Sequence, residues 1–84
     1  MAERGMSMRL SDVGRGRRVT VVKVADPRLR PQAARLGIQA GVLLLVKAVV
    51  PQGPVIVQTG PVTVAVGRRL AARIEVHPWT RKPV

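Results

Sequence analysis

Few side chains of this sequence could take part in chemistry. It has one histidine, His77, no cysteine, and four carboxylates: Glu3, Asp12, Asp26 and Glu75. Glu75 and His77 are two positions apart, so on a strand both would lie on one face and offer an oxygen and an imidazole to Fe²⁺ or another divalent transition metal. Two ligands do not complete a metal site. We therefore favour the alternative interpretation, an exposed strand face on which Glu75 pairs with a nearby arginine.

The patterns of the common catalytic sites are missing from the sequence. It has no G-x-x-x-x-G-K-[ST] phosphate loop, no G-x-S-x-G elbow and no pair of neighbouring acids. His77 has no cysteine and no suitably placed serine to activate. The sequence therefore predicts a protein without enzymatic activity and without a resident cofactor.

Basic residues dominate the charge of the chain. Fifteen Lys and Arg stand against four Asp and Glu, a net charge of +11, while 46% of residues are hydrophobic. Eight of the twelve arginines fall in three clusters: Arg15, Arg17 and Arg18; Arg28, Arg30 and Arg35; Arg68 and Arg69. Such clusters fit an acidic partner, either the phosphates of a nucleic acid or the anionic surface of a membrane. The structural alternative is a solvated basic surface with no dedicated partner.

Length and hydropathy limit the organisation to one small domain. The 84 residues contain no apolar run near the roughly 20 needed to span a membrane, and the N-terminus lacks the apolar core of a secretory signal. We expect a cytoplasmic protein with a flexible N-terminus (1–8), one folded domain (9–77) and a C-terminal tail (78–84).

The pattern of apolar residues predicts short strands separated by turns. We expect five strands, at 17–25, 42–50, 55–59, 62–66 and 73–77, where β-branched residues alternate or cluster. A short helix is expected over 31–38, with Gly37 in a left-handed conformation at its end, and helical turns over 10–14 and 67–71. Pro51 and Gly53 favour a type I turn. A sheet this small tends to curl and close, which removes its edges, so we predict a mainly β fold, an SH3-like barrel, with an OB-like barrel as the alternative.

Several motifs together resemble one protein family. These are L-S-D-V-x-x-G (Leu10–Gly16), R-L-G-I-Q-A-G (Arg35–Gly41), P-Q-G-P (Pro51–Pro54) and A-V-G-R-x-x-A-x-x-I-x-V (Ala65–Val76). Their order and spacing resemble ferrous iron transport protein A (FeoA) domains over residues 8–77. Ala40 stands where the family usually has Pro, and the segment 60–71 is about one residue longer than is typical.

The resemblance implies a function by contact with another protein. FeoA-like domains are SH3-like barrels associated with bacterial ferrous iron uptake, and their expected partner is the cytoplasmic part of the FeoB-type membrane transporter. On that basis the helix and the loop after it are the expected docking face, with Arg35, Leu36, Ile38 and Gln39. Trp79 would either anchor a partner or cover an end of the barrel.

Two other associations remain open at this stage. One is a homo-oligomer, because an exposed aliphatic rim near Leu43, Leu45 and Ile38 would suit self-association. The other is a nucleic-acid-binding barrel, because Gly14–Val19 also resembles the pattern of ribosomal KOW-type barrels. Against nucleic acid stands the aromatic content, since Trp79 is the one aromatic ring on which bases could stack.

Overall fold

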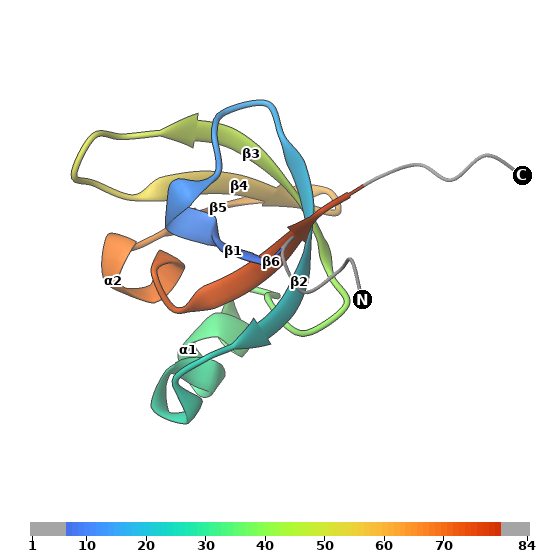
Figure 1. Cartoon of the computed structure of the whole chain (residues 1–84), viewed down its shortest axis with the longest axis vertical. Helices are drawn as coiled ribbons and strands as arrows, with labels where there is room; N and C mark the ends of the chain where they lie inside the picture. The colour runs from blue at the N-terminus through green and yellow to red at the C-terminus, as the bar shows by residue number, and fades with distance from the viewer. Residues whose placement is uncertain (1–6, 80–84) are drawn as a thin grey trace, which may run out of the picture.

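The chain forms a single antiparallel sheet of six strands (Figure 1) in a computed structural model that describes residues 7–79. The strands are β1 (Met8–Arg9), β2 (Arg18–Val24), β3 (Leu43–Val49), β4 (Val55–Thr59), β5 (Val62–Val66) and β6 (Ile74–Pro78). The helical segments are η2 (Leu10–Asp12), η3 (Pro27–Leu29), α1 (Arg30–Arg35) and α2 (Arg68–Ala71). The prediction of a mainly β fold is confirmed. Of the predicted terminal segments, residues 1–6 and 80–84 lie outside the described residues.

The first strand is the element that the sequence did not predict. β1 has two residues, and Met8 lies opposite Val76 while Arg9 lies opposite Glu75 in β6. Two residues are too few for an alternating pattern to be visible. β1 nevertheless pairs Met8, from the stretch expected to be flexible, with the last strand of the sheet.

The predicted barrel is partly open in residues 7–79, because no strand pairing joins the two ends of the sheet. The strand order is β1-β6-β2-β3-β4-β5, so β1 and β5 each have a neighbour on one side. The remaining opening is flanked by α2, which lies close to η2. The sheet curls as expected, and two of its strands remain edges.

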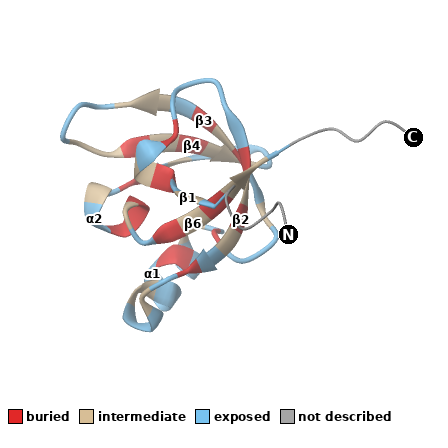
Figure 2. Ribbon diagram, viewed as in Figure 1, coloured by how far each residue is buried: buried red, intermediate tan, exposed pale blue. Residues whose placement is uncertain are grey.

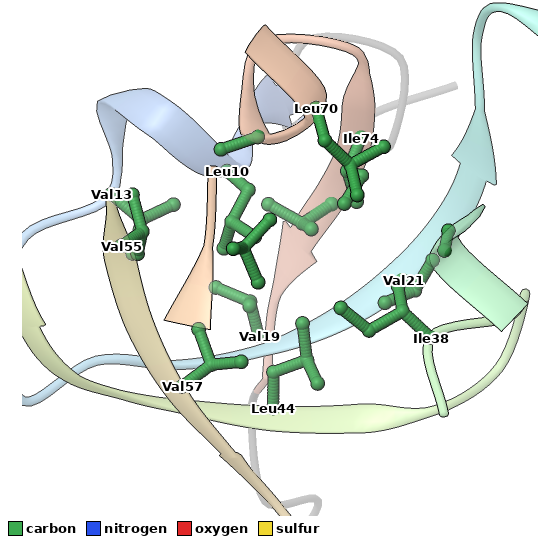
Figure 3. Close-up of a cluster of buried hydrophobic side chains, with 14 of the residues drawn as sticks. Leu10, Val13, Val19, Val21, Ile38, Leu44, Val55, Val57, Leu70 and Ile74 are labelled. Atoms are coloured by element: carbon green, nitrogen blue, oxygen red, sulfur yellow. The ribbon is translucent and has the colours of Figure 1, made fainter. Parts of the chain in front are cut away.

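The core is aliphatic and is built from alternate residues of the strands (Figure 2, Figure 3). It draws on every strand from β2 to β6 and on the helical segments: Leu10, Val19, Val21, Ala33, Ile38, Leu44, Val46, Val55, Val57, Val66, Leu70, Ala71, Ile74 and Val76. Among the described residues no polar or charged side chain is buried. Dispersion and apolar burial therefore stabilise the interior without polar networks.

The helix end follows the predicted motif closely. Gly37 has φ +81°, in the left-handed region that an L-residue adopts only with strain. Its N–H donates to the Ala34 carbonyl at 2.9 Å, and the Ile38 N–H donates to the Ala33 carbonyl at 2.9 Å. These two bonds satisfy the last carbonyls of α1 and turn the chain so that Ile38 enters the core.

The turn between β3 and β4 corrects the prediction of a type I turn. Gln52 has φ +58°, which after Pro51 indicates a type II turn, and the Gly53 N–H donates to the Val50 carbonyl at 2.8 Å. Glycine is needed one position later for a steric reason. A Cβ on Gly53 would lie 2.8 Å from Cγ1 of Val50, so the glycine permits close approach.

Candidate functional site

The predicted helix–loop face divides into surface and core. Arg35 and Gln39 are exposed, and Leu36 is half-buried against the core. Ile38 is 1% exposed, and Figure 3 shows it among the buried aliphatic residues. Arg35 and Gln39 can meet a partner directly, whereas Ile38 mainly holds the loop against the sheet.

An apolar cleft lies between α1, the end of β2 and the loop after the helix. Its volume is about 270 Å³, and its lining comes from three elements: Lys23 and Val24; Arg30 and Ala34; Ile38, Gln39 and Ala40. The Arg30 Nε donates to the Val24 carbonyl at 3.4 Å, which ties the start of α1 to β2. We refer to this feature as the α1–β2 cleft. Its lining is mainly apolar and includes two exposed cationic side chains, Lys23 and Arg30.

Sequence analysis found part of this cleft. Ile38 and Gln39 were expected at the docking face, and both line it. Lys23 and Ala34 were missed, because Ala34 looks like an ordinary helix former and Lys23 belongs to a strand with a bulge. The register of β2 against β6 shifts between Val21 and Lys23, and a bulge re-aims the side chains near it.

Trp79 lies at the other end of β2, away from the α1–β2 cleft. The backbone N–H of Trp79 donates to the Arg18 carbonyl at 2.8 Å, and the Arg18 guanidinium is 5.9 Å from the centroid of the Trp79 ring. Trp79 is 40% exposed. A shallow cleft of about 240 Å³ also touches Arg18 and is lined by Leu43, Leu45, Gln58 and Gly60. The structure therefore joins two predicted residues, Trp79 and Arg18, and separates both from the helix–loop face.

The basic clusters differ in whether their side chains are exposed or hydrogen-bonded within the fold. Arg15, Arg17 and Arg18 are exposed in the segment that leads into β2. Arg68 is engaged, because its Nε donates to the Gly53 carbonyl and its Nη2 to the Val50 carbonyl, both at 3.1 Å. These bonds fasten α2 to the β3–β4 turn. The predicted pair Arg68 and Arg69 thus splits into a structural residue and an exposed one.

Arg69 belongs to a polar cleft near the start of η3. It lines a cleft of about 420 Å³ together with Asp26, Arg28, Leu29 and Arg73. Asp26 accepts from the Arg28 backbone N–H at 3.0 Å and from the Arg28 Nε at 3.3 Å. These hydrogen bonds hold the pKa of the Asp26 carboxyl below its usual value, and Asp26 in turn raises the pKa of Arg28.

The residues considered as metal ligands do not assemble a metal site. Glu75 and His77 both lie on β6, as predicted, and are half-buried. Glu75 accepts a hydrogen bond from the Ser7 hydroxyl at 3.3 Å. Asp12 lines a cleft together with Glu75, but its carboxylate forms an ion pair with Arg9 at 3.3 Å. Within residues 7–79 no three His, Cys, Asp or Glu side chains gather as metal ligands would. Glu75 and His77 therefore do not belong to a cluster of three such side chains in the part of the chain that the structure describes.

Comparison with known proteins adds a family and a set of structures. The family model described as the FeoA domain matches residues 8–78. No curated protein matches the sequence. None of the helices described for this chain has the length and apolar character needed to cross a bilayer.

Three solved structures illustrate the similarity. A crystal structure of an iron uptake regulatory protein, FeoA, is 31% identical with a TM-score of 0.81, covering 88% of this chain and 99% of the other. The solution structure of FeoA from Chlorobium tepidum is also 31% identical, with a TM-score of 0.76, covering 90% of this chain and 74% of the other. A zinc complex of FeoA from Stenotrophomonas maltophilia, described as an SH3 domain protein, is 24% identical with a TM-score of 0.69, covering 82% and 88%.

Proposed function

Because this chain belongs to the FeoA domain family, we propose that it is a non-enzymatic accessory protein of ferrous iron transport that docks on the cytoplasmic part of a FeoB-type transporter. Family membership makes it a small protein associated with iron transport. The docking surface is the α1–β2 cleft with the exposed residues Arg35 and Gln39 beside it. It acts at the cytoplasmic face of the membrane.

One observation supports this docking surface above the others. The motif R-L-G-I-Q-A-G, which resembles the family, supplies three of the residues that line the α1–β2 cleft: Ile38, Gln39 and Ala40. After Gly37 the loop runs beside β2, where the Gly41 N–H donates to the Val21 carbonyl at 2.8 Å. A segment that resembles the family therefore lines the apolar cleft.

The chemistry of the α1–β2 cleft suits an apolar side chain of a partner with acidic residues around it. Val24, Ala34 and Ile38 line it with aliphatic atoms, and the exposed Lys23 and Arg30 add two positive charges to its lining. Interfaces commonly combine such an apolar centre with a charged border that selects the partner and speeds encounter. A net charge of +11 also suits a position close to an anionic membrane surface.

The test is a pair of charge-matched variants on one helix. Ala34 is exposed and lines the cleft, so Ala34→Glu places a carboxylate in it without disturbing the core. Gln32 is exposed on the same helix outside the cleft lining, so Gln32→Glu is the control. At about 150 mM salt, we expect Ala34→Glu to weaken binding to the purified cytoplasmic region of the transporter at least about tenfold and Gln32→Glu to leave it nearly unchanged.

Competition separates this function from the alternatives. The matched structures do not favour the nucleic-acid alternative, and Arg68 is already bonded within the fold. Duplex RNA and vesicles of anionic lipid should therefore fail to displace the protein from the transporter. Absence of transporter binding together with salt-graded binding to RNA would overturn the proposal, as would equal loss in both variants.

A further inference from the structure

β5 has hydrogen-bonding neighbours on one side, and its other edge is open. It pairs with β4 in the register Thr59 to Val62, Gln58 to Thr63 and Val57 to Val64. The hairpin loop is Gly60–Pro61, so Val62, Val64 and Val66 direct their backbone N–H and C=O groups toward β4. Thr63 and Ala65 therefore direct theirs to the open edge, and both residues are exposed.

The open edge lacks the devices with which proteins protect such strands. β5 contains neither a charged residue nor a proline, and the sequence has no charged residue between Lys47 and Arg68. Lysines, prolines, bulges or a covering helix normally prevent edge pairing. Val62 is also 52% exposed, the largest exposure among the large hydrophobic residues described. In a chain with 23% charged residues, this segment stands out as able to approach another strand.

We propose that two copies of this chain associate through their β5 edges, which pair antiparallel about a two-fold axis at Val64. In that register Thr63 lies opposite the partner's Ala65, Val64 opposite the partner's Val64, and Val62 opposite the partner's Val66. Each of the two Thr63–Ala65 pairs exchanges two N–H···O=C bonds. The two six-stranded sheets become one continuous sheet.

Several observations select a second copy as the occupant of the β5 edge. A docking strand for an acidic partner would carry basic residues in a chain of net charge +11, and β5 carries none. A charge at the centre of a self-pairing strand would face its own copy across the two-fold axis, so an uncharged strand suits this pairing. Thr63 and Ala65 also have small side chains, so their pairing on the exposed face of the sheet meets no steric barrier.

This association has a salt dependence of characteristic sign. The charges of the two copies repel one another across the dimer, while the joint itself is neutral. Added salt screens that repulsion, so the dimer should become tighter as salt rises. Binding to an acidic protein, a nucleic acid or an anionic membrane would weaken instead. The proposal does not depend on the transporter, since the α1–β2 cleft lies on other elements.

Sedimentation of the full chain tests the proposal. We expect a monomer–dimer equilibrium between about 10 µM and about 1 mM protein, shifted toward dimer at higher salt. Ala65→Pro removes an N–H that the fold itself does not use and blocks the edge, so it should stay monomeric while keeping its circular dichroism spectrum. Gln32→Lys, an exposed change on α1, is the control and should dimerise like the wild type.

Hydrogen exchange gives a second reading that needs no variant. In dilute wild-type protein the amides of Thr63 and Ala65 should exchange rapidly and those of Val64 and Val66 slowly. Raising the concentration should slow exchange at Thr63 and Ala65 by at least about tenfold as the dimer forms. A wild type that stays monomeric to 1 mM would overturn the proposal. So would a dimer in which Thr63 and Ala65 remain unprotected, or one that a folded Ala65→Pro variant still forms.

Discussion

The tripeptide Val-Thr-Val occurs in two strands of this fold and has two different environments. In β2, Val19 and Val21 are 0% and 2% exposed, and Thr20 lies between His77 of β6 and Leu43 of β3. In β5, Val62 is 52% exposed, Thr63 is exposed, and Val64 is half-buried. β2 has neighbours on both sides, whereas β5 has one neighbour and ends the sheet.

The difference shows that the position of a strand in the sheet decides what its residues contribute. Both segments have the β-branched composition and the alternation that favour a strand. Only the neighbours distinguish an interior strand, where the segment stabilises the fold, from an edge, where it remains available for association. The contrast can be tested by making the same change in both segments.

Proline at the central threonine should have the largest effect. Thr20→Pro removes a donor from a ladder with strands on both sides and leaves a facing carbonyl unpaired, so we expect a loss of about 3 kcal/mol or more, enough to unfold a marginal domain. Thr63→Pro removes a donor from the open edge and should cost less than about 1 kcal/mol. Urea unfolding of both variants at low protein concentration measures the difference. Equal losses would mean that β5 is not an edge in solution.

Truncation of the first valine should have the next largest effect. Val19→Ala removes buried methyl groups and leaves a cavity, so the free energy of unfolding should fall by about 2 kcal/mol. Val62→Ala acts at a position that is half exposed and should change it by less than about 0.5 kcal/mol. Chemical denaturation reports both values. A loss at Val62 as large as that at Val19 would show that the exposed residue is covered.

A smaller effect is expected at the charged residue that opens β2, for which β5 has no counterpart. Arg18 stacks near Trp79, and such contacts at exposed sites contribute about 0.5–1 kcal/mol. Arg18→Gln should therefore lower stability by that amount and change the fluorescence of Trp79, which is the single tryptophan of the chain. Arg17→Gln, the neighbouring exposed change, should leave the emission unaltered. An emission change in both variants would assign it to net charge.

The smallest effect concerns the residues that follow β2. Hydrogen bonds from Arg28 lower the pKa of the Asp26 carboxyl in the folded protein. Asp26 therefore stabilises the folded state at pH values above its pKa in the unfolded chain, about 3.9. This stabilisation is lost as the pH falls through the pKa of Asp26 in the folded state. Asp26→Asn should therefore lose less stability than the wild type on acidification from about pH 5 to about pH 2.5. Thermal unfolding across that range measures it. Parallel curves would contradict a role for the Asp26–Arg28 pair.

Sequence reasoning recovered most of the fold because most of its signals are local. Alternating valines indicated β2, β4 and β5, and Gly37 marked the end of α1 by its conformation. The two-residue β1 and the open edge of β5 were not visible, because both depend on which strands become neighbours. The same limit applied to the candidate site. Ile38 and Gln39 were found from their motif, while Ala34 and Lys23 reach the cleft through tertiary packing.

The pairing of β6 with β1 and β2 bears on how the molecule is made. β6 comes last among the strands, yet it lies between the first two in the sheet. Met8 must find Val76 across 68 positions of chain, and such distant pairings form slowly because loop closure costs entropy before contacts compensate. During translation, the edges of β1 and β2 that pair with β6 have no partner until residues 74–78 have been synthesised. Until then these edges are open to wrong pairings, the general hazard of a strand whose partner is made last.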